Sequence, residues 1–257
     1  MTHFAPSERF PLVSVIMPCY NAERFIAQAI ESVVAQTYQE WELLVSDDCS
    51  TDGSVPLVKS YAAADGRIRL VKASTNGGAA MARNAAIRVA KGRFLAFLDS
   101  DDLWHPEKLE RQIAFMLGHQ HAFTYTSYAI VDEQGERCGT SVQPPPSLSY
   151  SEYLRNTAIG CLTVVVDRNQ LGDVTMQSQP MHEDFATWLQ LLKRIDRAYG
   201  LREELAFYRV VADSLSHNKL KAAKQVWRIY REVEGLGLLR SLYSFWGYAI
   251  HAVMKRL

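Results

Sequence analysis

Short apolar runs that alternate with amphipathic segments of helical length constrain the fold of this chain more than any other feature. Runs rich in β-branched and aromatic residues predict strands, and apolar residues at helical spacing predict helices between them. The predicted strands cover residues 13–17, 41–45, 68–72 and 94–98, and the predicted helices cover residues 23–36, 55–64 and 78–90. Continuous apolar strands separated by helices are typical of a mostly parallel sheet covered on both faces.

The second half of the chain is less regular. Its patterns predict strands over residues 123–131, 163–167 and 205–210, and helices over residues 106–117, 184–192, 220–233 and 238–256. We find no internal repeat and no flexible linker. A length of 257 residues fits one α/β domain, or one domain with a short appendage.

Polar residues follow three of the predicted strands, at residues 18–21, 46–50 and 99–102. Ligands of open α/β sheets bind outside the carboxyl ends of the strands. Several acids at one edge repel one another unless a cation or a donor-rich ligand compensates them. Each aspartate taken alone could be a turn residue or a helix cap, but three clusters at three strand ends favour a ligand site.

Asp99 and Asp101 are two residues apart, directly after a buried strand. Their hard oxygen atoms suit Mg²⁺ or Mn²⁺, and such ions keep open positions for phosphate oxygens. An Asp-x-Asp pair is weak evidence by itself because surface turns often contain one. After the apolar run FLAFL, and before Trp104 and Pro106, the pair becomes a much stronger signal.

Several alternative classes lack their motifs. The chain has no GxGxxG after its first strand, no GxxxxGK[ST] and no GxSxG. Its four cysteines form no CxxC pair, which argues against a zinc site, and the N-terminus lacks the apolar core of a signal peptide. We therefore expect a cytoplasmic chain with reduced thiols, and no nucleic acid as partner.

At this point the motifs resemble a known family. Residues 13–54 (VSVIMPCYNAERF through SDDCSTDGS), residues 76–112 (NGGAAMARN through HPEKLERQ) and HEDFATWLQLL at 182–192 resemble inverting family-two glycosyltransferases of the GT-A fold. Residues 156–168 and 214–224 are similar to the teichuronic-acid subgroup of bacterial surface-polysaccharide transferases. The resemblance implies a Rossmann-like nucleotide-binding half with a mixed sheet in residues 1–217, and a basic amphipathic helical extension in residues 218–257.

Carried over by position, the family implies a set of residues for the nucleotide sugar. Asp48 should accept a hydrogen bond from the uracil imide, and Arg83 should reach the base or the diphosphate. Asp47 should support the turn. The full set of expected donor-binding residues is Pro18, Tyr20, Asn21, Asp48, Arg83, Asp99 and Ser100.

The family also implies a metal site and a catalytic base. Asp101 and Asp99 should bind Mn²⁺ or Mg²⁺, with His217 as a third ligand or, equally, an exposed loop residue. Asp184 should be the general base and Glu183 its neighbour in the acceptor pocket; without the resemblance, Asp184 would be read as a helix cap. The sequence departs from the family at Cys49, where glycine is usual, and at Phe185, where tryptophan is.

The implied reaction moves a hexose from a UDP-sugar to a surface-polysaccharide or polyprenyl-linked glycan acceptor, with inversion. Two other functions stay open: a nucleotide-sugar-binding module without catalysis, and a nucleotidyltransferase. The oligomeric state is open as well.

The C-terminal segment carries the charge asymmetry of an otherwise neutral chain. Residues 219–257 contain eight Lys or Arg and two acids, a net charge of about +6. The helix predicted over residues 238–256 has one apolar side. That pattern is compatible with contact to an anionic membrane at the inner face of the cell, with packing against the catalytic domain, and with a partner subunit.

Overall fold

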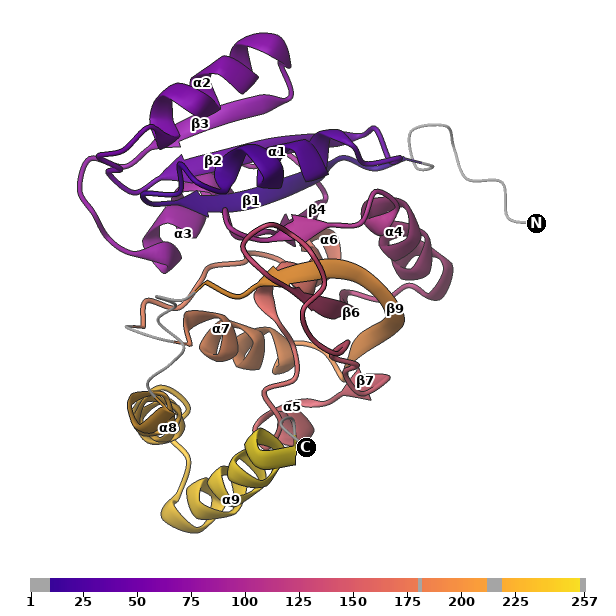
Figure 1. Cartoon of the computed structure of the whole chain (residues 1–257). Helices are drawn as coiled ribbons and strands as arrows, with labels where there is room; N and C mark the ends of the chain where they lie inside the picture. Colours follow the sequence, from indigo (N-terminus) through magenta and orange to yellow (C-terminus); the bar gives the residue numbers. More distant parts are fainter. Residues whose placement is uncertain (1–9, 180–181, 212–218, 255–257) are drawn as a thin grey trace.

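The computed structural model describes residues 10–179, 182–211 and 219–254. Within these residues nine strands form one sheet in the order β3-β2-β1-β4-β8-β6-β9-β5, and β7 pairs with β9 (Figure 1). The strands are β1 (Val13–Cys19), β2 (Trp41–Asp47), β3 (Ile68–Lys72), β4 (Phe94–Phe97), β5 (Leu103–Trp104), β6 (Phe123–Val131), β7 (Ser147–Leu148), β8 (Val165–Asp167) and β9 (Ala198–Arg209).

The sheet is parallel only in part. β1 to β4 are parallel to one another, as predicted. β8 runs antiparallel to both of its neighbours, β4 and β6, while β6 and β9 are parallel. The expectation of a mostly parallel sheet therefore fails in the second half, whereas the mixed sheet implied by the family is confirmed. β5 and β7 have two residues each, too few for a periodicity to reveal them.

Helices cover both faces of the sheet because side chains alternate along each strand. Val13, Val15 and Met17 of β1 pack in one core cluster with α1, α2 and α4, and Ile16 packs in a second cluster with α3, α5 and α7. The helices are α1 (Ile26–Val34), α2 (Ser54–Ala64), α3 (Ala79–Val89), α4 (Lys108–His119), α5 (Tyr150–Tyr153), α6 (Arg168–Leu171) and α7 (Glu183–Leu192), with a 3-10 turn, η1, at Cys161–Thr163.

The C-terminal helices continue the second core cluster. They are α8 (Lys219–Arg228), a π-helical turn η3 (Ile229–Val233) and α9 (Leu238–Met254). Val226, Ile229 and Tyr230 are fully buried in the cluster that also contains Phe185 of α7. No helix in the described part of the chain combines the length and the hydropathy needed to cross a bilayer.

Candidate functional site

The carboxyl ends of β1, β2 and β4 open into one cleft of about 480 Å³. Most of the residues expected to bind the nucleotide sugar or the metal line it, namely Pro18, Tyr20, Asp48, Arg83, Asp99, Ser100 and Asp101. Cys19, Asn76, Gly78, Ala79, Ala82, Asp102 and Tyr208 complete the lining. The cleft forms where parallel strands end side by side, because β1 lies between β2 and β4 in the sheet.

Asp48 connects the end of β2 to the start of α3. Its two carboxylate oxygens accept hydrogen bonds from the backbone N–H groups of Gly77 and Gly78, at 2.8 and 2.7 Å. Gly78 has φ of 79°, which a residue with a side chain rarely adopts, so glycine suits this close turn. Each oxygen of Asp48 keeps a second lone pair for a ligand.

The loop after β1 is held by Asn21, which does not line the cleft. Its side-chain oxygen accepts from the Thr51 N–H at 2.8 Å, and its own N–H donates to the hydroxyl of Ser50 at 2.9 Å. Asp47 accepts from the Ser50 N–H, which is the supporting turn geometry expected for it. Cys49 has φ of 67°, a left-handed conformation that glycine would adopt without strain.

Arg83 links the cleft to α7. This arginine is 4% exposed, and its guanidinium donates to Asp99 at 2.5 Å and to Glu183 at 2.7 Å. The sequence predicted contact with the base or the diphosphate, whereas the structure places the guanidinium between these two carboxylates. A buried arginine requires such partners because an unpaired charge is costly to bury.

The acids after β4 lie close together with little compensating charge. Burial and the neighbouring charge of Asp99 raise the pKa of Asp101 to about 6. Asp102 is buried and accepts from the Arg209 N–H at 2.8 Å, and the Arg209 Nε donates to the Asp101 carbonyl at 2.7 Å. Two adjacent acids with raised proton affinity fit a divalent cation, which would supply the missing positive charge.

The described residues contain no group of three or more His, Cys, Asp or Glu side chains that could hold a metal ion. Asp99 and Asp101 would thus provide two protein ligands, and the remaining positions would go to a ligand or water. His217, the third expected ligand, lies outside the described residues.

Asp184 lies in the first turn of α7, next to the Arg83 network. The helix begins at Glu183 after His182, so Asp184 is not the residue that caps it. Its carboxylate accepts from the N–H of Phe185 at 2.7 Å. Burial, followed by the charge of Glu183, raises the pKa of Asp184 to about 6. A carboxylate with this pKa is suited to accept a proton near neutral pH.

Two cleft residues have no signal in the sequence that could have revealed them. Tyr208 belongs to β9, and Asn76 precedes α3 and donates to the Asp48 carbonyl at 3.0 Å. Asp102 could have been included, because it continues the same acidic run. Tyr208 reaches the cleft only because β9 crosses the sheet to pair with β5 and β6.

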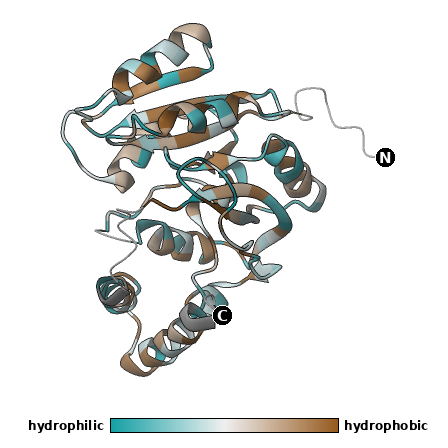
Figure 2. Cartoon of the chain, in the orientation of Figure 1, coloured by the Kyte–Doolittle hydropathy of each residue, from teal (hydrophilic) through white to brown (hydrophobic). Residues whose placement is uncertain are grey.

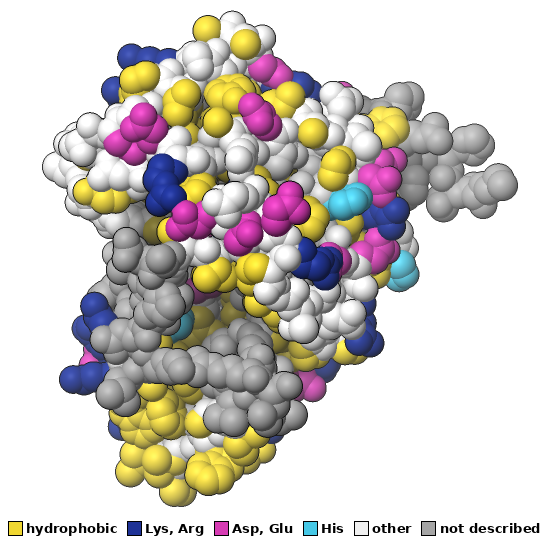
Figure 3. Space-filling view, viewed as in Figure 1, with side chains coloured by type: hydrophobic (Ala, Val, Ile, Leu, Met, Phe, Trp, Pro, Cys, Tyr) yellow, Lys and Arg dark blue, Asp and Glu magenta, His cyan; other side chains and the backbone are white. Residues whose placement is uncertain are grey.

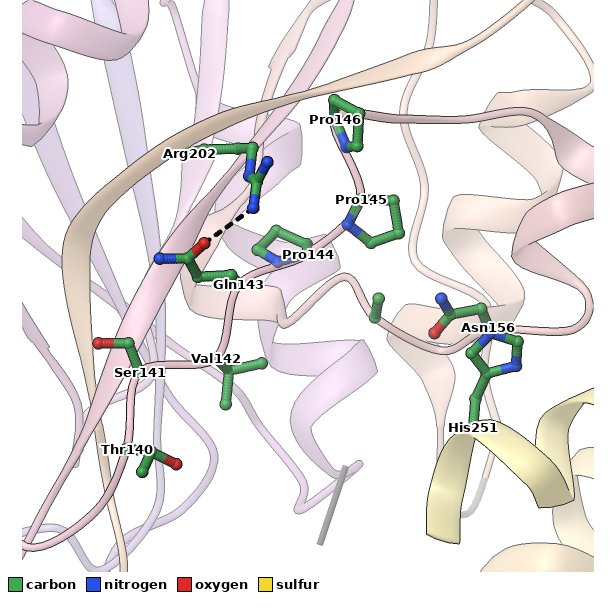
Figure 4. Close-up of a pocket in the computed structure, with 11 residues that line it drawn as sticks. Thr140, Ser141, Val142, Gln143, Pro144, Pro145, Pro146, Asn156, Arg202 and His251 are labelled. Carbon is green, nitrogen blue, oxygen red and sulfur yellow. Dashed lines mark hydrogen bonds between the residues drawn. The ribbon is translucent and has the colours of Figure 1, made fainter. Parts of the chain in front are cut away.

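A second cavity, of about 510 Å³, shares no residue with the cleft. Figure 4 shows the loop from Thr140 to Pro146 on one side and His251 of α9 beside Asn156 on the other. Arg202 of β9 donates to Gln143 at 2.9 Å across the wall of this cavity. No acid lines it, so it offers no base and no metal ligand of its own.

Comparisons with known proteins agree with this geometry. The model of the family described as Glycosyl transferase family 2 matches residues 14–166. The chain is 47% identical to TuaG of Bacillus subtilis (strain 168), a protein named for teichuronic acid biosynthesis, over 96% of this chain and 98% of the relative. It is 40% identical to WfgD of Escherichia coli, named UDP-Glc:alpha-D-GlcNAc-diphosphoundecaprenol beta-1,3-glucosyltransferase, over 95% of this chain and 94% of the relative.

Solved structures share the fold at lower identity. S. aureus TarS in complex with UDP-GlcNAc superposes with a TM-score of 0.71 at 22% identity, over 93% of this chain and 71% of that one. The mannosyltransferase PcManGT from Pyrobaculum calidifontis, in complex with GDP-Man and Mn²⁺, superposes with a TM-score of 0.69 at 18% identity, over 95% and 73%.

Proposed function

Because this chain belongs to glycosyl transferase family 2, we propose that it transfers a hexose from a UDP-sugar to a surface-polysaccharide or polyprenyl-linked glycan, with inversion. The chain has the GT-A fold predicted from its sequence. One observation carries the proposal. Arg83 joins Asp99 at the cleft to Glu183 beside Asp184, so an acid-lined nucleotide cleft and a candidate base share one ion-pair network.

The donor would occupy the cleft between the ends of β1, β2 and β4. Pro18 and Tyr20 would flank the base, and Asp48 would accept the uracil imide N–H with a lone pair that Gly77 and Gly78 leave free. The names of two E. coli relatives, WfgD and WfaP, specify UDP-Glc as donor and a diphosphoundecaprenol-linked acceptor. These names support the choice of donor and acceptor class.

The transfer would be a single displacement. The deprotonated carboxylate of Asp184 takes the proton of an acceptor hydroxyl, the hydroxyl oxygen bonds to the anomeric carbon, and the bond from that carbon to the diphosphate oxygen breaks. A direct displacement inverts the anomeric centre and needs no covalent enzyme intermediate. The pKa of Asp184 near 6 leaves it deprotonated at neutral pH and still basic enough to share a proton in the transition state.

The leaving diphosphate needs positive charge. Asp99 and Asp101 would hold Mn²⁺ or Mg²⁺, which when bound neutralises charge on the diphosphate. Arg83, already paired with Asp99, keeps that carboxylate in place at the edge of the cleft. The Mn²⁺ in the PcManGT complex supports a divalent ion on this fold, and the part of His217 as a ligand stays a prediction.

The two alternatives have less support. A binding module without catalysis would have no need of a buried carboxylate whose pKa is raised to about 6 beside the cleft, as Asp184 has. A nucleotidyltransferase would need a glycine-rich basic phosphate loop near its N-terminus, and residues 18–24 contain neither a glycine nor a lysine.

The proposal is tested with a panel of nucleotide sugars. UDP-sugars, GDP-mannose and dTDP-sugars are offered with Mn²⁺, Mg²⁺ or chelator, and both thermal stabilisation and release of nucleoside diphosphate are measured. We expect a UDP-sugar to be hydrolysed only with metal. NMR of the product formed with a diphosphoundecaprenol-linked acceptor should show an inverted anomeric configuration.

Asp101→Ala serves as the metal-site variant, with Asp173→Ala, an exposed acid outside the cleft, as its matched control. Asp101→Ala should abolish transfer and remove the tightening of UDP binding by metal, while Asp173→Ala should behave as the wild type. Normal turnover of Asp101→Ala in chelator would refute metal assistance at this site.

A further inference from the structure

α9 presents an unusually apolar surface to solvent. Six large apolar side chains on this one helix are between 42% and 83% exposed, namely Leu238, Leu239, Leu242, Tyr243, Trp246 and Ile250. All other exposed side chains of this kind in the described residues are scattered singly over the rest of the chain. Figure 3 shows hydrophobic side chains gathered at the α9 end of the molecule, and Figure 2 shows brown stretches along the same helix. A contiguous patch of this kind marks an interaction surface.

The orientation of α9 explains this exposure. The helix packs inward with small residues, because Ser241 and Ser244 are buried and a Cβ at Gly247 would lie 2.8 Å from the Cβ of Arg155. A surface helix of a globular protein normally turns its large apolar residues to the core. In α9 only Phe245 and Tyr248 pack partly inward, and Phe245 meets Trp227 of α8 edge-on.

The charge around this face is positive. Lys224, Arg228, Arg231 and Arg240 belong to the same C-terminal segment, and all four are exposed. Of its two acids, Glu234 has a fully buried carboxylate paired with Lys193 at 2.8 Å, so it adds little negative charge to the surface. An apolar helix face bordered by Lys and Arg matches the surface of an anionic bilayer.

We propose that α9 lies flat in the surface of an anionic lipid bilayer, with Leu239 and Trp246 inserted among the lipids. The length of a bilayer-spanning helix is not required, because the helix axis runs along the membrane. Tryptophan and tyrosine, present here as Trp246 and Tyr243, are favoured at the boundary between lipid and water. A two-fold contact with a second copy is disfavoured, since it would bring the same basic segments together.

This placement would serve the proposed function, on which its benefit rests, if the acceptor is lipid-linked. Phe185, next to Asp184, contacts Tyr153 of α5 and Tyr230 of η3, with ring centroids 5.2 and 6.1 Å apart. α7 therefore lies between the sheet and the C-terminal helices, on the α9 side of the molecule (Figure 1). A bilayer at α9 would present a lipid-linked sugar on the side of the base.

The test is co-sedimentation of the full chain with vesicles of phosphatidylglycerol and phosphatidylcholine, and with vesicles of phosphatidylcholine alone. The wild type should sediment with the anionic vesicles and be released by salt. The double variant Leu239→Gln/Trp246→Gln, which keeps good helix formers at exposed positions, should bind at least ~10-fold more weakly. Val34→Gln/Val89→Gln, which alters two exposed residues of α1 and α3, is the matched control and should bind as the wild type.

Two further readouts keep the interpretation sharp. Hydrolysis of the UDP-sugar in solution should be equal for the wild type and both double variants, which separates a failure of membrane binding from a failure of the proposed function. Trp41, Trp104 and Trp188 are buried, so the blue shift of tryptophan emission on adding anionic vesicles should come mainly from Trp246. Trp246→Phe should lose most of that shift and still sediment.

The proposal is overturned if wild type and the Leu239/Trp246 variant sediment equally with anionic vesicles, or if neither binds them. It is equally overturned if sedimentation velocity finds a dimer that this variant dissociates while vesicles have no effect, because the face would then belong to a second copy of the chain.

Discussion

At the scale of single residues, burial sets the chemistry of the site. Asp184 is surrounded by core residues of α5 and α7, and both that burial and the charge of Glu183 oppose its ionisation. Asp48 by contrast is fixed by two backbone N–H groups, so its geometry is set by the turn before α3. One carboxylate is thus suited to move a proton and the other to hold a ligand, and each can be tested separately.

Asp184→Asn separates catalysis from folding. The amide keeps the shape and can accept from the Phe185 N–H, but it cannot take a proton from an acceptor hydroxyl. We expect unchanged thermal stability and donor affinity, with turnover reduced by about 10²–10⁴. Steady-state kinetics, calorimetry with UDP and thermal unfolding measure the three quantities. A stable variant with wild-type turnover would remove Asp184 from the role of base.

The same residue predicts a pH profile. A base must be deprotonated to act, so the turnover number of the wild type should fall as the pH decreases through about 6, where Asp184 becomes protonated. An aspartate in water would give this limb near pH 4. The limb should be missing from the residual activity of Asp184→Asn.

Asp48→Ala should weaken UDP binding by about 1.5–3 kcal/mol, the range expected for a hydrogen bond to a charged group. Because the substitution also frees Gly77 and Gly78, Asp48→Asn is the control that retains one acceptor for this turn. The uracil contact predicts that both variants lose preference for UDP over CDP, since cytosine has no imide N–H. Unchanged calorimetric affinity for UDP in Asp48→Ala would exclude this contact.

At the scale of elements, α4 is attached to the sheet through a buried lysine. The ammonium of Lys108 donates to Gln112 within the helix and to the Thr163 carbonyl at 3.4 Å, and it lies 4.7 Å from the centre of the Trp104 ring. Burial lowers the pKa of Lys108 to about 7. The contacts hold α4 against η1, beside the strand that carries the acids of the cleft.

This lysine makes stability depend on pH. The unfolded chain keeps the Lys108 proton up to about pH 10.5, whereas the folded chain releases it near pH 7, so the unfolded state binds more protons between these values. The free energy of unfolding should therefore rise with pH in this range. Lys108→Met should flatten the rise, measured by urea unfolding at several pH values, while Lys72→Met at an exposed site should not. Parallel profiles of Lys108→Met and wild type would contradict the assignment.

At the scale of the whole molecule, the C-terminal segment completes the core. The division at residue 217 stays a prediction, and the burial of Val226, Ile229 and Tyr230 against α5 and α7 implies that residues 218–257 belong to the same folding unit. Burying each such side chain contributes about 1.5–3 kcal/mol. Three of them together are comparable with the ~5–15 kcal/mol that stabilises a whole domain.

Truncation tests this inference. A chain ending at residue 217 should unfold at a much lower temperature than the full chain or fail to fold, because Phe185 and Tyr153 would lose their cover. A chain ending at residue 236 keeps α8 and η3 and should lose far less. Thermal unfolding of both fragments measures the difference, and a 1–217 fragment as stable as the full chain would show that the extension is a separate unit.

The sequence by itself determined the strands β1 to β4, the helices between them and the polar residues at their ends, because apolar periodicity is local and parallel strands end at a shared edge. Only the tertiary structure decided that Arg83 pairs with Glu183, that Tyr208 reaches the cleft, and that α9 turns its small residues inward. These outcomes join residues far apart in the chain. The apolar pattern of a helix identifies two sides, and packing against α5 and α8 selects which of them faces solvent.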